Sequence, residues 1–362
     1  MNRVAGVYIS FPFCAQKCTY CNFASGVFPR SLQDEYQGVL VAEIERHRFE
    51  WRPETVFLGG GTPSSMELPA LAAVLAAIPG RPWKEATLEA APGTVTAERA
   101  RAWSAAGINR VSLGVQSFIR EEIAATGRNH RAETVVSDLE TLREAGISNY
   151  NIDLIAGLAG QTMSSWRQSL DWIARLSPPH CSVYMLEIDD DSRLGREKLL
   201  GGVRYGAGRL PSEGETADMY ELAVDWLAGL GIPRYEISNF AQPGFESLHN
   251  LKYWQLEPYI GFGADAHSFD GTERWRNMES PEDYVGAGSA EPVAANLMEE
   301  KFFVGLRLTR GICPTPQEWR RYEAAIGRFV NEGLLETEGE TLRLTRRGVL
   351  LSNEVFQEFL NQ

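Results

Sequence analysis

The stretch FPFCAQKCTYCNF, at residues 11–23, decides the fold, and it directly follows the first strand-like segment of the chain. It places Cys14, Cys18 and Cys21 in a C-x3-C-x2-C spacing. Cysteine thiolates hold iron–sulfur clusters, and a four-iron cluster held by only three cysteines keeps one iron open to bind another molecule. The spacing therefore predicts a [4Fe–4S] cluster with one vacant coordination position.

Two other interpretations of these cysteines stay open: a zinc site short of one ligand, or three incidental buried thiols. A structural zinc site usually shows a second pair of ligands at a characteristic spacing, and the sequence contains no such pair. The other two cysteines, Cys181 and Cys313, are isolated, and we expect both to be core residues. This cysteine usage fits a reducing compartment better than a disulfide framework.

The composition is typical of a globular protein with one large domain and a smaller one. The chain has 362 residues, of which 44% are hydrophobic and 23% charged. Its formal net charge of −13 argues against a nucleic-acid-binding surface. The chain shows neither a secretory signal nor a run of about 20 apolar residues, so we expect a cytoplasmic protein that does not span a membrane. Peripheral membrane contact stays open.

Strand-like and helix-like segments alternate along the first half of the chain, which predicts a parallel α/β sheet. Gly107 and Gly146 each follow a predicted helix, where a C-terminal glycine with positive φ belongs. Six units are fewer than the eight of a closed barrel, and function should lie at the carboxyl ends of the strands. The predicted strands are residues 7–11, 55–58, 86–90, 110–115, 150–155 and 181–186, and the predicted helices are residues 32–49, 68–78, 97–106, 132–145 and 163–176.

We divide the chain into three predicted parts. Residues 1–190 form the barrel core, and residues 191–295 form an extension that begins with an acidic, glycine-rich connection or lid at 189–214. Residues 296–362 form a C-terminal α+β module with a winged-helix-like order of elements, which we expect to be structural or to serve docking.

Glycine-rich and charged residues follow several of the predicted strands. Three glycines in GGGTPS, at residues 59–64, allow the backbone to approach a ligand closely, and a tight turn without a ligand is the alternative. Glu89 places a carboxylate at the barrel mouth, where it can pair with a cation. Gln116 and Asp153 can bind hydroxyl groups or position a substrate, and Arg128 can hold a carboxylate.

The cysteine motif, with an aromatic residue just before its last cysteine, resembles the signature of radical S-adenosylmethionine (SAM) enzymes. The resemblance implies a partial (β/α)6 barrel in which the open iron binds the amino and carboxylate groups of SAM. It also implies that Gly60, Gly61 and Thr62 contact the amino end of SAM, and that Glu89 pairs with the SAM ammonium group.

Together with GVQSF at 114–118 and NIDLIAGL at 151–158, these motifs resemble the family of oxygen-independent coproporphyrinogen III oxidase (HemN) and its relatives. That resemblance implies that Tyr8 contacts the cofactor beside Glu89, although an aromatic residue in a first strand is usually core. It further implies that Gln116, Arg128 and Asp153 line the second part of the site.

Two departures from the oxidase resemble the HemW branch, whose members are described as heme chaperones. The oxidase has a fourth cysteine where this chain has Phe23, and it carries a substantial segment before the cluster motif, whereas Cys14 lies almost at the start here. HNLKYW, at residues 249–254, resembles the H-N-x-x-Y-W element of that branch. The resemblance implies that the chain binds heme and transfers it to acceptor proteins.

His249 is the first candidate for a heme ligand, with Tyr253 and Trp254 offering a flat apolar surface to the porphyrin. The alternative is a packed histidine that holds the end of the barrel. His267 is the second candidate. We expect no such role for the other three histidines, His47, His130 and His180.

Several functional alternatives remain at this point. Radical chemistry would need an electron donor such as flavodoxin or ferredoxin, and the chain could then be an oxidase or a radical SAM methyltransferase. A cluster-dependent homodimer is a further hypothesis. The chaperone interpretation is favoured over decarboxylation because of Phe23 and the HNLKYW element.

Overall fold

The computed structural model describes residues 4–286 and 291–360, and it contains the predicted parallel sheet. Strands β1 to β6 pair in parallel in sequence order, each with the next. They form the centre of an eleven-stranded sheet with the order β11-β10-β9-β8-β1-β2-β3-β4-β5-β6-β7. The six strands are β1 (Val4–Phe11), β2 (Arg52–Gly60), β3 (Glu85–Ala90), β4 (Arg110–Gln116), β5 (Asn149–Ala156) and β6 (His180–Met185).

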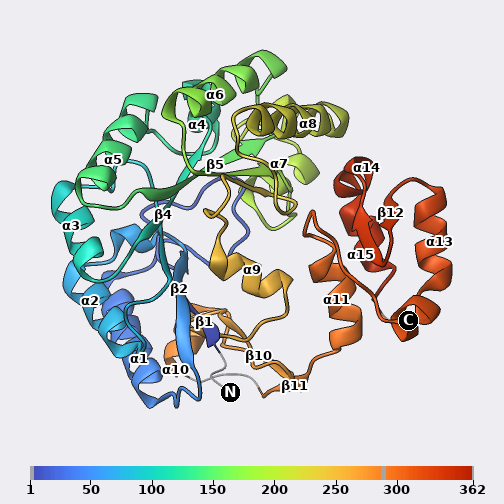
Figure 1. Ribbon diagram of the computed structural model, residues 1–362. Helices are drawn as coiled ribbons and strands as arrows, with labels where there is room; N and C mark the ends of the chain where they lie inside the picture. Colours follow the sequence, from blue (N-terminus) through green and yellow to red (C-terminus); the bar gives the residue numbers. More distant parts are fainter. Residues whose placement is uncertain (1–3, 287–290, 361–362) are drawn as a thin grey trace.

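Crossover helices cover the outer face of these strands (Figure 1). In the first of them, Tyr36, Leu40 and Ile44 are buried at a spacing of four residues, which turns one apolar face toward the sheet. Gly107 and Gly146 have φ values of +98° and +83°, as predicted for helix C-termini. The helices are α1 (Arg30–Arg46), α2 (Leu68–Ala77), α3 (Ala97–Ala105), α5 (Ala132–Glu144) and α6 (Met163–Leu176), with the short, unpredicted η1 (Pro63–Ser65) and α4 (Arg120–Ala125) between strands and helices.

Additional strands extend both edges of the six-stranded core without closing it into a barrel. β7 (Asn239–Ala241) runs antiparallel to β6, and β8 (Tyr259–Phe262) runs parallel to β1. Sequence reasoning missed these strands because each is short and its partner lies far away in the chain. Antiparallel strands β9 (His267–Phe269), β10 (Glu273–Arg276) and β11 (Val293–Ala294) continue the sheet beyond β8.

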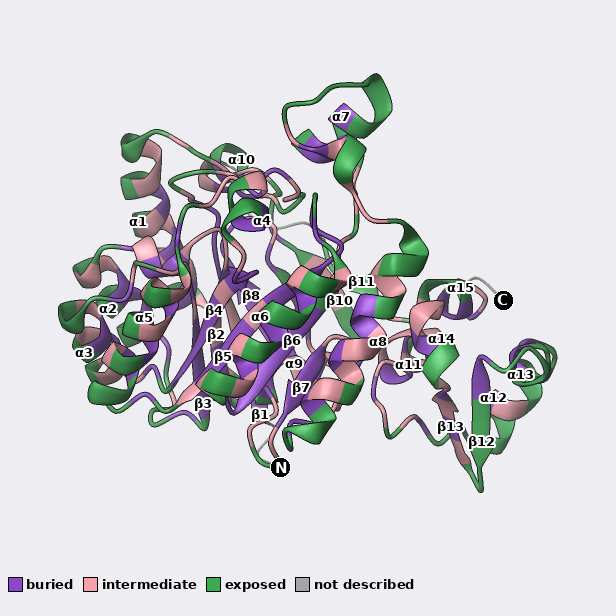
Figure 2. Cartoon of the chain, turned by 90° about the horizontal axis from the view of Figure 1, so that it is seen from above, coloured by how far each residue is buried: buried purple, intermediate pink, exposed green. Residues whose placement is uncertain are grey.

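The acidic, glycine-rich segment predicted as a connection is a folded lobe. It contains α7 (Arg193–Leu200) and η2 (Ala207–Arg209), and α8 (Glu213–Gly229) follows it. The carboxylate of Glu197 accepts the backbone N–H groups of the three consecutive residues 205–207, which ties the end of the lobe to its helix. Figure 2 shows α7 standing out from the body of the molecule.

The C-terminal module has the predicted order of helices around a β-hairpin. The hairpin pairs β12 (Leu335–Glu338) with β13 (Thr341–Leu344) in antiparallel register. Arg346 joins the module to α8 through Asp225 at 2.8 Å and Glu221 at 3.1 Å. The helices are α11 (Leu297–Gly305), α12 (Pro316–Arg321), α13 (Glu323–Asn331), α14 (Arg346–Leu350) and α15 (Ser352–Gln357), and α10 (Pro281–Gly286) precedes the module.

The structure tests the expectation that the two isolated cysteines are core residues. Cys181 is buried as predicted, but Cys313 is exposed, so the prediction that it belongs to the core is wrong.

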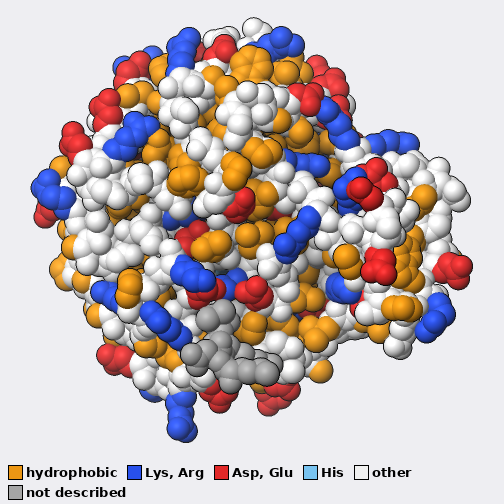
Figure 3. Space-filling model, in the orientation of Figure 1, with side chains coloured by type: hydrophobic (Ala, Val, Ile, Leu, Met, Phe, Trp, Pro, Cys, Tyr) orange, Lys and Arg blue, Asp and Glu red, His pale blue; other side chains and the backbone are white. Residues whose placement is uncertain are grey.

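Figure 3 shows acidic and basic side chains interspersed over one face of the molecule. No helix among residues 4–286 and 291–360 is both long and apolar enough to cross a bilayer.

Candidate functional site

The cysteine loop follows β1 and folds back on its own start. Cys14 N–H donates to Gly26 O at 2.8 Å, and Gly26 N–H donates to Pro12 O at 2.9 Å. These two bonds close the loop at its base, while Cys14, Cys18 and Cys21 are all half-buried. The three thiols therefore lie on one closed loop at the carboxyl end of β1, where the sequence predicts the functional end of the barrel.

The glycine-rich turn after β2 packs directly under this loop. Gly61 N–H donates to Phe11 O at 2.8 Å and Thr62 N–H to Phe13 O at 3.0 Å. A Cβ on Gly61 would lie 2.9 Å from Cys14 Sγ, closer than real side chains approach. Glycine is thus required at 61 because the cysteine loop comes so close, and the turn and the loop form one unit.

The surroundings of the thiols suit an anionic metal cluster. Burial raises the pKa of the Cys14 thiol, while hydrogen bonds from Thr62 and Ser25 act in the opposite direction. Arg128 Nε lies 3.3 Å from Cys18 Sγ, so a cation faces the second cysteine. This cation would offset negative charge on a metal cluster bound by the loop.

No group of three or more His, Cys, Asp or Glu side chains in the described part of the chain has the geometry to hold a single metal ion. In a four-iron cluster each cysteine binds a different iron, so its ligand sulfurs lie further apart than the ligands of one ion. The expectation of a cluster accordingly rests on the spacing of the cysteines and on the environment of their thiols.

Glu89 projects into the interior beside the glycine-rich turn. Its carboxylate accepts a hydrogen bond from the backbone of Gly60, whose φ of +106° is open to glycine but strained for other residues. The pKa of Glu89 is raised to about 8, mainly by burial and secondly by the charge of Asp153. A cationic ligand would stabilise the ionised form of this carboxyl group, because the ligand would replace the solvation that burial removed.

Asp153 lies on the neighbouring strand β5 within a polar network. Asn151 Nδ2 donates to Asp153 Oδ1 at 2.6 Å, and Ser112 Oγ donates to Asp153 Oδ2 at 3.3 Å. Burial raises the pKa of Asp153, and the hydrogen bond from Ser182 is the first effect that opposes this. The carboxyl groups of Glu89 on β3 and Asp153 on β5 therefore lie close enough to interact, and the region around these two residues is called the chamber below.

Gln116 ends β4 in an uncommon backbone conformation. Its φ is +70°, the pairing of β4 with β5 shifts register there, and its buried Oε1 has no hydrogen-bond partner. Strained residues of this kind cluster at ligand sites, where the strain positions a side chain. Arg128 Nη1 donates to Gly114 O on the same strand, which links the Gln116 region to the cysteine loop.

Tyr8 also faces the interior rather than the outer core. A Cβ on Gly59 would lie 3.1 Å from Tyr8 Oη, which places the phenol beside the glycine-rich turn. The pKa of Tyr8 is raised, mainly by burial and secondly by the charge of Glu89, so its hydroxyl stays protonated. The structure therefore gathers the predicted residues at one end of the sheet: Tyr8, Gly60, Gly61, Thr62, Glu89, Gln116, Arg128 and Asp153.

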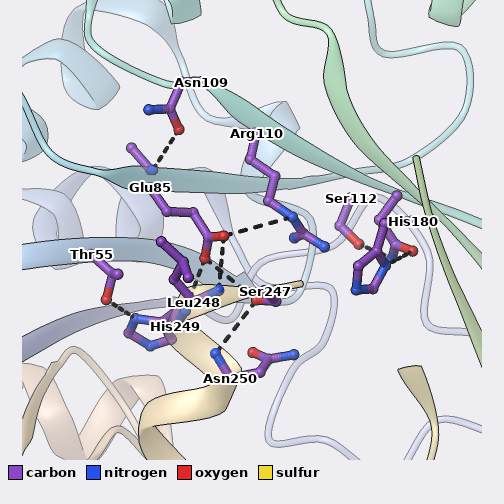
Figure 4. A network of polar contacts seen from close by, with 12 residues as sticks. Thr55, Glu85, Asn109, Arg110, Ser112, His180, Ser247, Leu248, His249 and Asn250 are labelled. Carbon is purple, nitrogen blue, oxygen red and sulfur yellow. Dashed lines mark hydrogen bonds and ion pairs between the residues drawn. The ribbon is translucent and has the colours of Figure 1, made fainter. Parts of the chain in front are cut away.

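His249 lies at the other end of the sheet, in α9 (Leu248–Trp254), which covers the amino ends of the strands (Figure 4). A Cβ on Gly6 near the start of β1 would touch its ring at 2.9 Å. Gly6 and Phe11 are five residues apart, so this position is about 16 Å from the base of the cysteine loop along β1. His249 is thus remote from the cysteine loop, although burial raises the pKa of its partner Tyr253, and Tyr8 and Glu89 lie close enough for their charges to raise that pKa further.

Both ring nitrogens of His249 are engaged. Nδ1 lies 2.8 Å from Thr55 Oγ1 and Nε2 lies 2.7 Å from Tyr253 Oη, while the ring is fully buried and stacks on Phe57. Burial lowers the pKa of His249 to about 3. An axial ligand needs an accessible nitrogen with a free lone pair, so this arrangement contradicts heme ligation and fits the alternative of a packed histidine.

The aromatic partners of His249 are also engaged in packing. Tyr253 meets Tyr259 edge to face at 4.6 Å between ring centroids, and Trp254 lies under the guanidinium of Arg307 at 4.4 Å. Both residues are half-buried and already have ring contacts within the protein, which argues against the porphyrin expectation.

His267, the second candidate, is placed very differently. Its side chain is 60% exposed, and Nε2 lies 4.0 Å from Asp265 Oδ1. Asp265 follows the carboxyl end of β8, on the same side of the sheet as the chamber. Although most of the side chain is exposed, partial burial of the ring lowers the pKa of His267, which favours the neutral imidazole that can bind a metal.

Sequence reasoning missed the contacts that close the amino end of the barrel. Glu85 is 3% exposed and accepts the N–H groups of Leu248 and His249, each at 2.9 Å. Arg110 lies 4.0 Å from the same carboxylate and is 2% exposed (Figure 4). A charged residue stands at the start of each of these two apolar strands, and this sequence feature could have predicted the buried pair.

Sequence reasoning also missed the contacts around the cysteine loop. Leu194 N–H of α7 donates to Thr19 O at 2.9 Å, and Thr19 N–H donates to Thr126 O at 3.1 Å. Gln16 Nε2 donates to Gly127 O at 2.6 Å. Residues from two distant parts of the sequence, 126–127 and 194, thus hold the loop, and no local sequence pattern predicts these contacts.

Comparisons with known proteins agree with this fold. Residues 8–173 match the model of the Radical SAM superfamily, and residues 294–351 match that of the HemN C-terminal domain. Coproporphyrinogen III oxidase (HemN) from Escherichia coli, a solved structure, superposes with a TM-score of 0.84 at 20% identity, covering 99% of this chain and 90% of that chain. At that identity the likeness concerns the fold.

Full-length relatives are more similar in sequence. A protein named "Heme chaperone HemW" from Lactococcus lactis subsp. lactis is 34% identical, over 99% of this chain and 98% of the relative. The protein of the same name from Bacillus subtilis is 33% identical, over 98% of this chain and 99% of the relative. The chain therefore belongs to the HemW family within the radical SAM superfamily.

Proposed function

We propose that this protein is a heme chaperone that binds heme and a [4Fe–4S] cluster with SAM, and that transfers heme to acceptor proteins. The observation that carries the proposal is the similarity to proteins named heme chaperones over 98–99% of the chain. That similarity spans both the sheet with its cysteine loop and the C-terminal module.

In this proposal Cys14, Cys18 and Cys21 would hold the cluster and leave one of its irons open for SAM. A cluster and SAM are what membership of the radical SAM superfamily implies. The chemistry that a bound cluster would supply is an electron for SAM cleavage, which would need a donor such as flavodoxin or ferredoxin. Gly61 and Thr62 belong to the turn that supports the loop, so their backbone is suited to the amino end of SAM.

The chamber residues would then hold the rest of the cofactor. Glu89 would carry the negative charge that pairs with the cationic part of SAM, and its raised pKa makes this pairing depend on pH. Asp153 and Gln116 lie where hydroxyl groups of the ribose can be bound, while Arg128 holds Cys18 and the backbone of β4. Tyr8 would close the site on the side of β1.

For heme we favour His267 as the ligand over His249. His267 is exposed beside Asp265 on the chamber side, whereas His249 is fully buried with both nitrogens hydrogen-bonded. A chaperone must release its cargo, and an exposed ligand suits that task better than a ligand inside the core.

The test is an anaerobic heme titration of the reconstituted protein, followed by the Soret band, with and without SAM. We expect saturation at about one heme per chain, and a shifted Soret band in His267→Ala but not in His249→Ala. The absence of saturable binding in the reconstituted wild-type protein would contradict the proposed function. Light scattering of the same samples tests the homodimer, which predicts a larger mass with the cluster than without it.

Oxygen-independent coproporphyrinogen oxidation is the second candidate, because the whole fold superposes on HemN. Phe23, at the position of the oxidase's fourth cysteine, is 67% exposed on the cysteine loop and favours the chaperone. Conversion of coproporphyrinogen III by the reconstituted protein would favour the oxidase. A methylated product would instead favour a radical SAM methyltransferase.

A further inference from the structure

The lobe formed by residues 189–209, hereafter the α7 lobe, exposes aliphatic side chains at its tip. Leu199, Leu200 and Val203 are 62%, 85% and 96% exposed, and they occupy the end of α7 and the turn that follows. Figure 2 shows this part of the chain outside the body of the molecule. Large apolar side chains at a protruding tip usually mark a surface that is covered in use.

The charge of the α7 lobe opposes that of the whole chain. From residue 189 to residue 209 the sequence has five basic side chains and four acidic ones, a net charge of +1 in a protein with a net charge of −13. Three of the acidic side chains are the consecutive aspartates 189–191 at the start of the lobe, and the fourth, Glu197, is turned inward onto the backbone N–H groups of residues 205–207. The basic side chains are all exposed: Arg193, Arg196, Lys198, Arg204 and Arg209.

Acidic side chains lie at the base of the lobe and not at its tip. Asp191 Oδ1 is 3.6 Å from Arg196 Nη2, and Asp189 Oδ2 accepts from Asn22 Nδ2 of the cysteine loop at 3.4 Å. Lys198 and Arg204 flank the aliphatic residues directly in the sequence. The tip therefore combines aliphatic side chains with positive charge.

We propose that the tip of the α7 lobe binds an anionic membrane surface, with Leu200 and Val203 entering the headgroup region and Lys198 and Arg204 contacting lipid phosphates. Aliphatic residues flanked by Lys and Arg are the composition that interfacial segments use. Three aliphatic side chains cover far less than the roughly 800 Å² per partner of a stable protein interface. The small size and the charge thus favour a bilayer over a protein partner.

The base of the lobe connects this membrane contact to the cysteine loop. Leu194 N–H donates to Thr19 O between the second and third cysteines, and Arg193 Nη1 donates to Lys17 O at 3.4 Å. Gly160 N–H donates to Arg209 O at 2.8 Å and anchors the other end of the lobe to the β5–α6 loop. Membrane binding at the tip would consequently place the cysteine loop next to the bilayer.

Cosedimentation of the full-length protein with lipid vesicles tests the inference. One vesicle contains equal parts of phosphatidylglycerol and phosphatidylcholine, and the other contains phosphatidylcholine alone. We expect wild-type protein to sediment with the anionic vesicles only, and Leu200→Ser/Val203→Ser to bind them about tenfold more weakly. Lys198→Glu/Arg204→Glu should lose binding to a similar extent. All four residues are exposed, so these variants should keep the fold, which circular dichroism checks.

Val293→Ser is the matched control, because Val293 is 68% exposed on β11 and lies outside the lobe. It should sediment like the wild type. Wild-type protein that stays in the supernatant with anionic vesicles would overturn the inference and point to a protein partner. Wild-type binding by either lobe variant would also overturn it. The heme titration is independent of these outcomes, so the proposed function and the membrane contact can fail separately.

Discussion

Gly61→Ala is the substitution that most directly probes the packing of the cysteine loop on the glycine-rich turn. The new methyl carbon would lie 2.7 Å from Phe13 O, 2.8 Å from Pro12 C and 2.9 Å from Cys14 Sγ. Each distance falls about 0.5–0.7 Å short of the 3.4 Å at which ordinary contact begins. Because two of the three atoms belong to the backbone, no side-chain rotation relieves the overlap.

The cysteine loop must therefore move away from the turn in Gly61→Ala. Overpacking of this kind costs about 1–3 kcal/mol, and the backbone at Gly61 lies outside the left-handed region, so the methyl group accounts for the whole cost. A penalty of that size disfavours the cluster-binding conformation roughly 5-fold to over 100-fold. We expect less iron and sulfide per chain after anaerobic reconstitution, and a lower free energy of unfolding in urea.

Gly38→Ala provides the control for this comparison. Gly38 lies inside α1, and a Cβ there would meet nothing within 4 Å. Replacing a helical glycine with alanine should raise the free energy of unfolding by about 1 kcal/mol and leave the iron content unchanged. If Gly61→Ala bound as much iron as wild type with equal stability, the close packing of loop and turn would be refuted.

Three further substitutions test other parts of the account. Glu85→Ala leaves Arg110 buried without its partner and should lower the free energy of unfolding by about 3–5 kcal/mol in urea, with a near-normal value contradicting the structural role of the pair. Because the pKa of Glu89 is raised to about 8 and a cation favours the ionised form, the affinity of the reconstituted protein for SAM should rise about tenfold from pH 7 to pH 9. Calorimetry should find this dependence absent in Glu89→Gln, and an equal slope in both proteins would count against the pairing. His249→Ala should lower thermal stability because it opens a cavity beside Phe57, without changing the Soret band; a changed band would restore His249 as a ligand.

The repeating strand–helix core could be predicted from the sequence because its signals are local. Each unit shows an apolar strand, a helix with apolar spacing of three and four, and at Gly107 and Gly146 a helix-ending glycine. The carboxyl ends of parallel strands meet at one edge, so motifs far apart in the chain could be assigned to one site. The structure does bring Glu89 and Asp153 into one chamber.

The parts that escaped prediction depend on contacts between distant residues. β8 joins β1 across some 250 residues of chain, and α9 is held by Glu85 through N–H groups that no sequence pattern reveals. His249 shows how this affects function, since a motif resemblance suggested a ligand and only the tertiary contacts reveal a packed ring. A local sequence pattern identifies candidate functional residues, but their burial in the folded structure decides which of them are accessible to a ligand.

The most direct test of the central claim measures bound heme and consumed coproporphyrinogen III in one anaerobic sample of the cluster-loaded protein with SAM. The account predicts saturable heme binding at about one equivalent and no loss of carboxyl groups from the porphyrinogen. Decarboxylation without stable heme binding would contradict the account and return the chain to the oxidases, despite Phe23 on its cysteine loop.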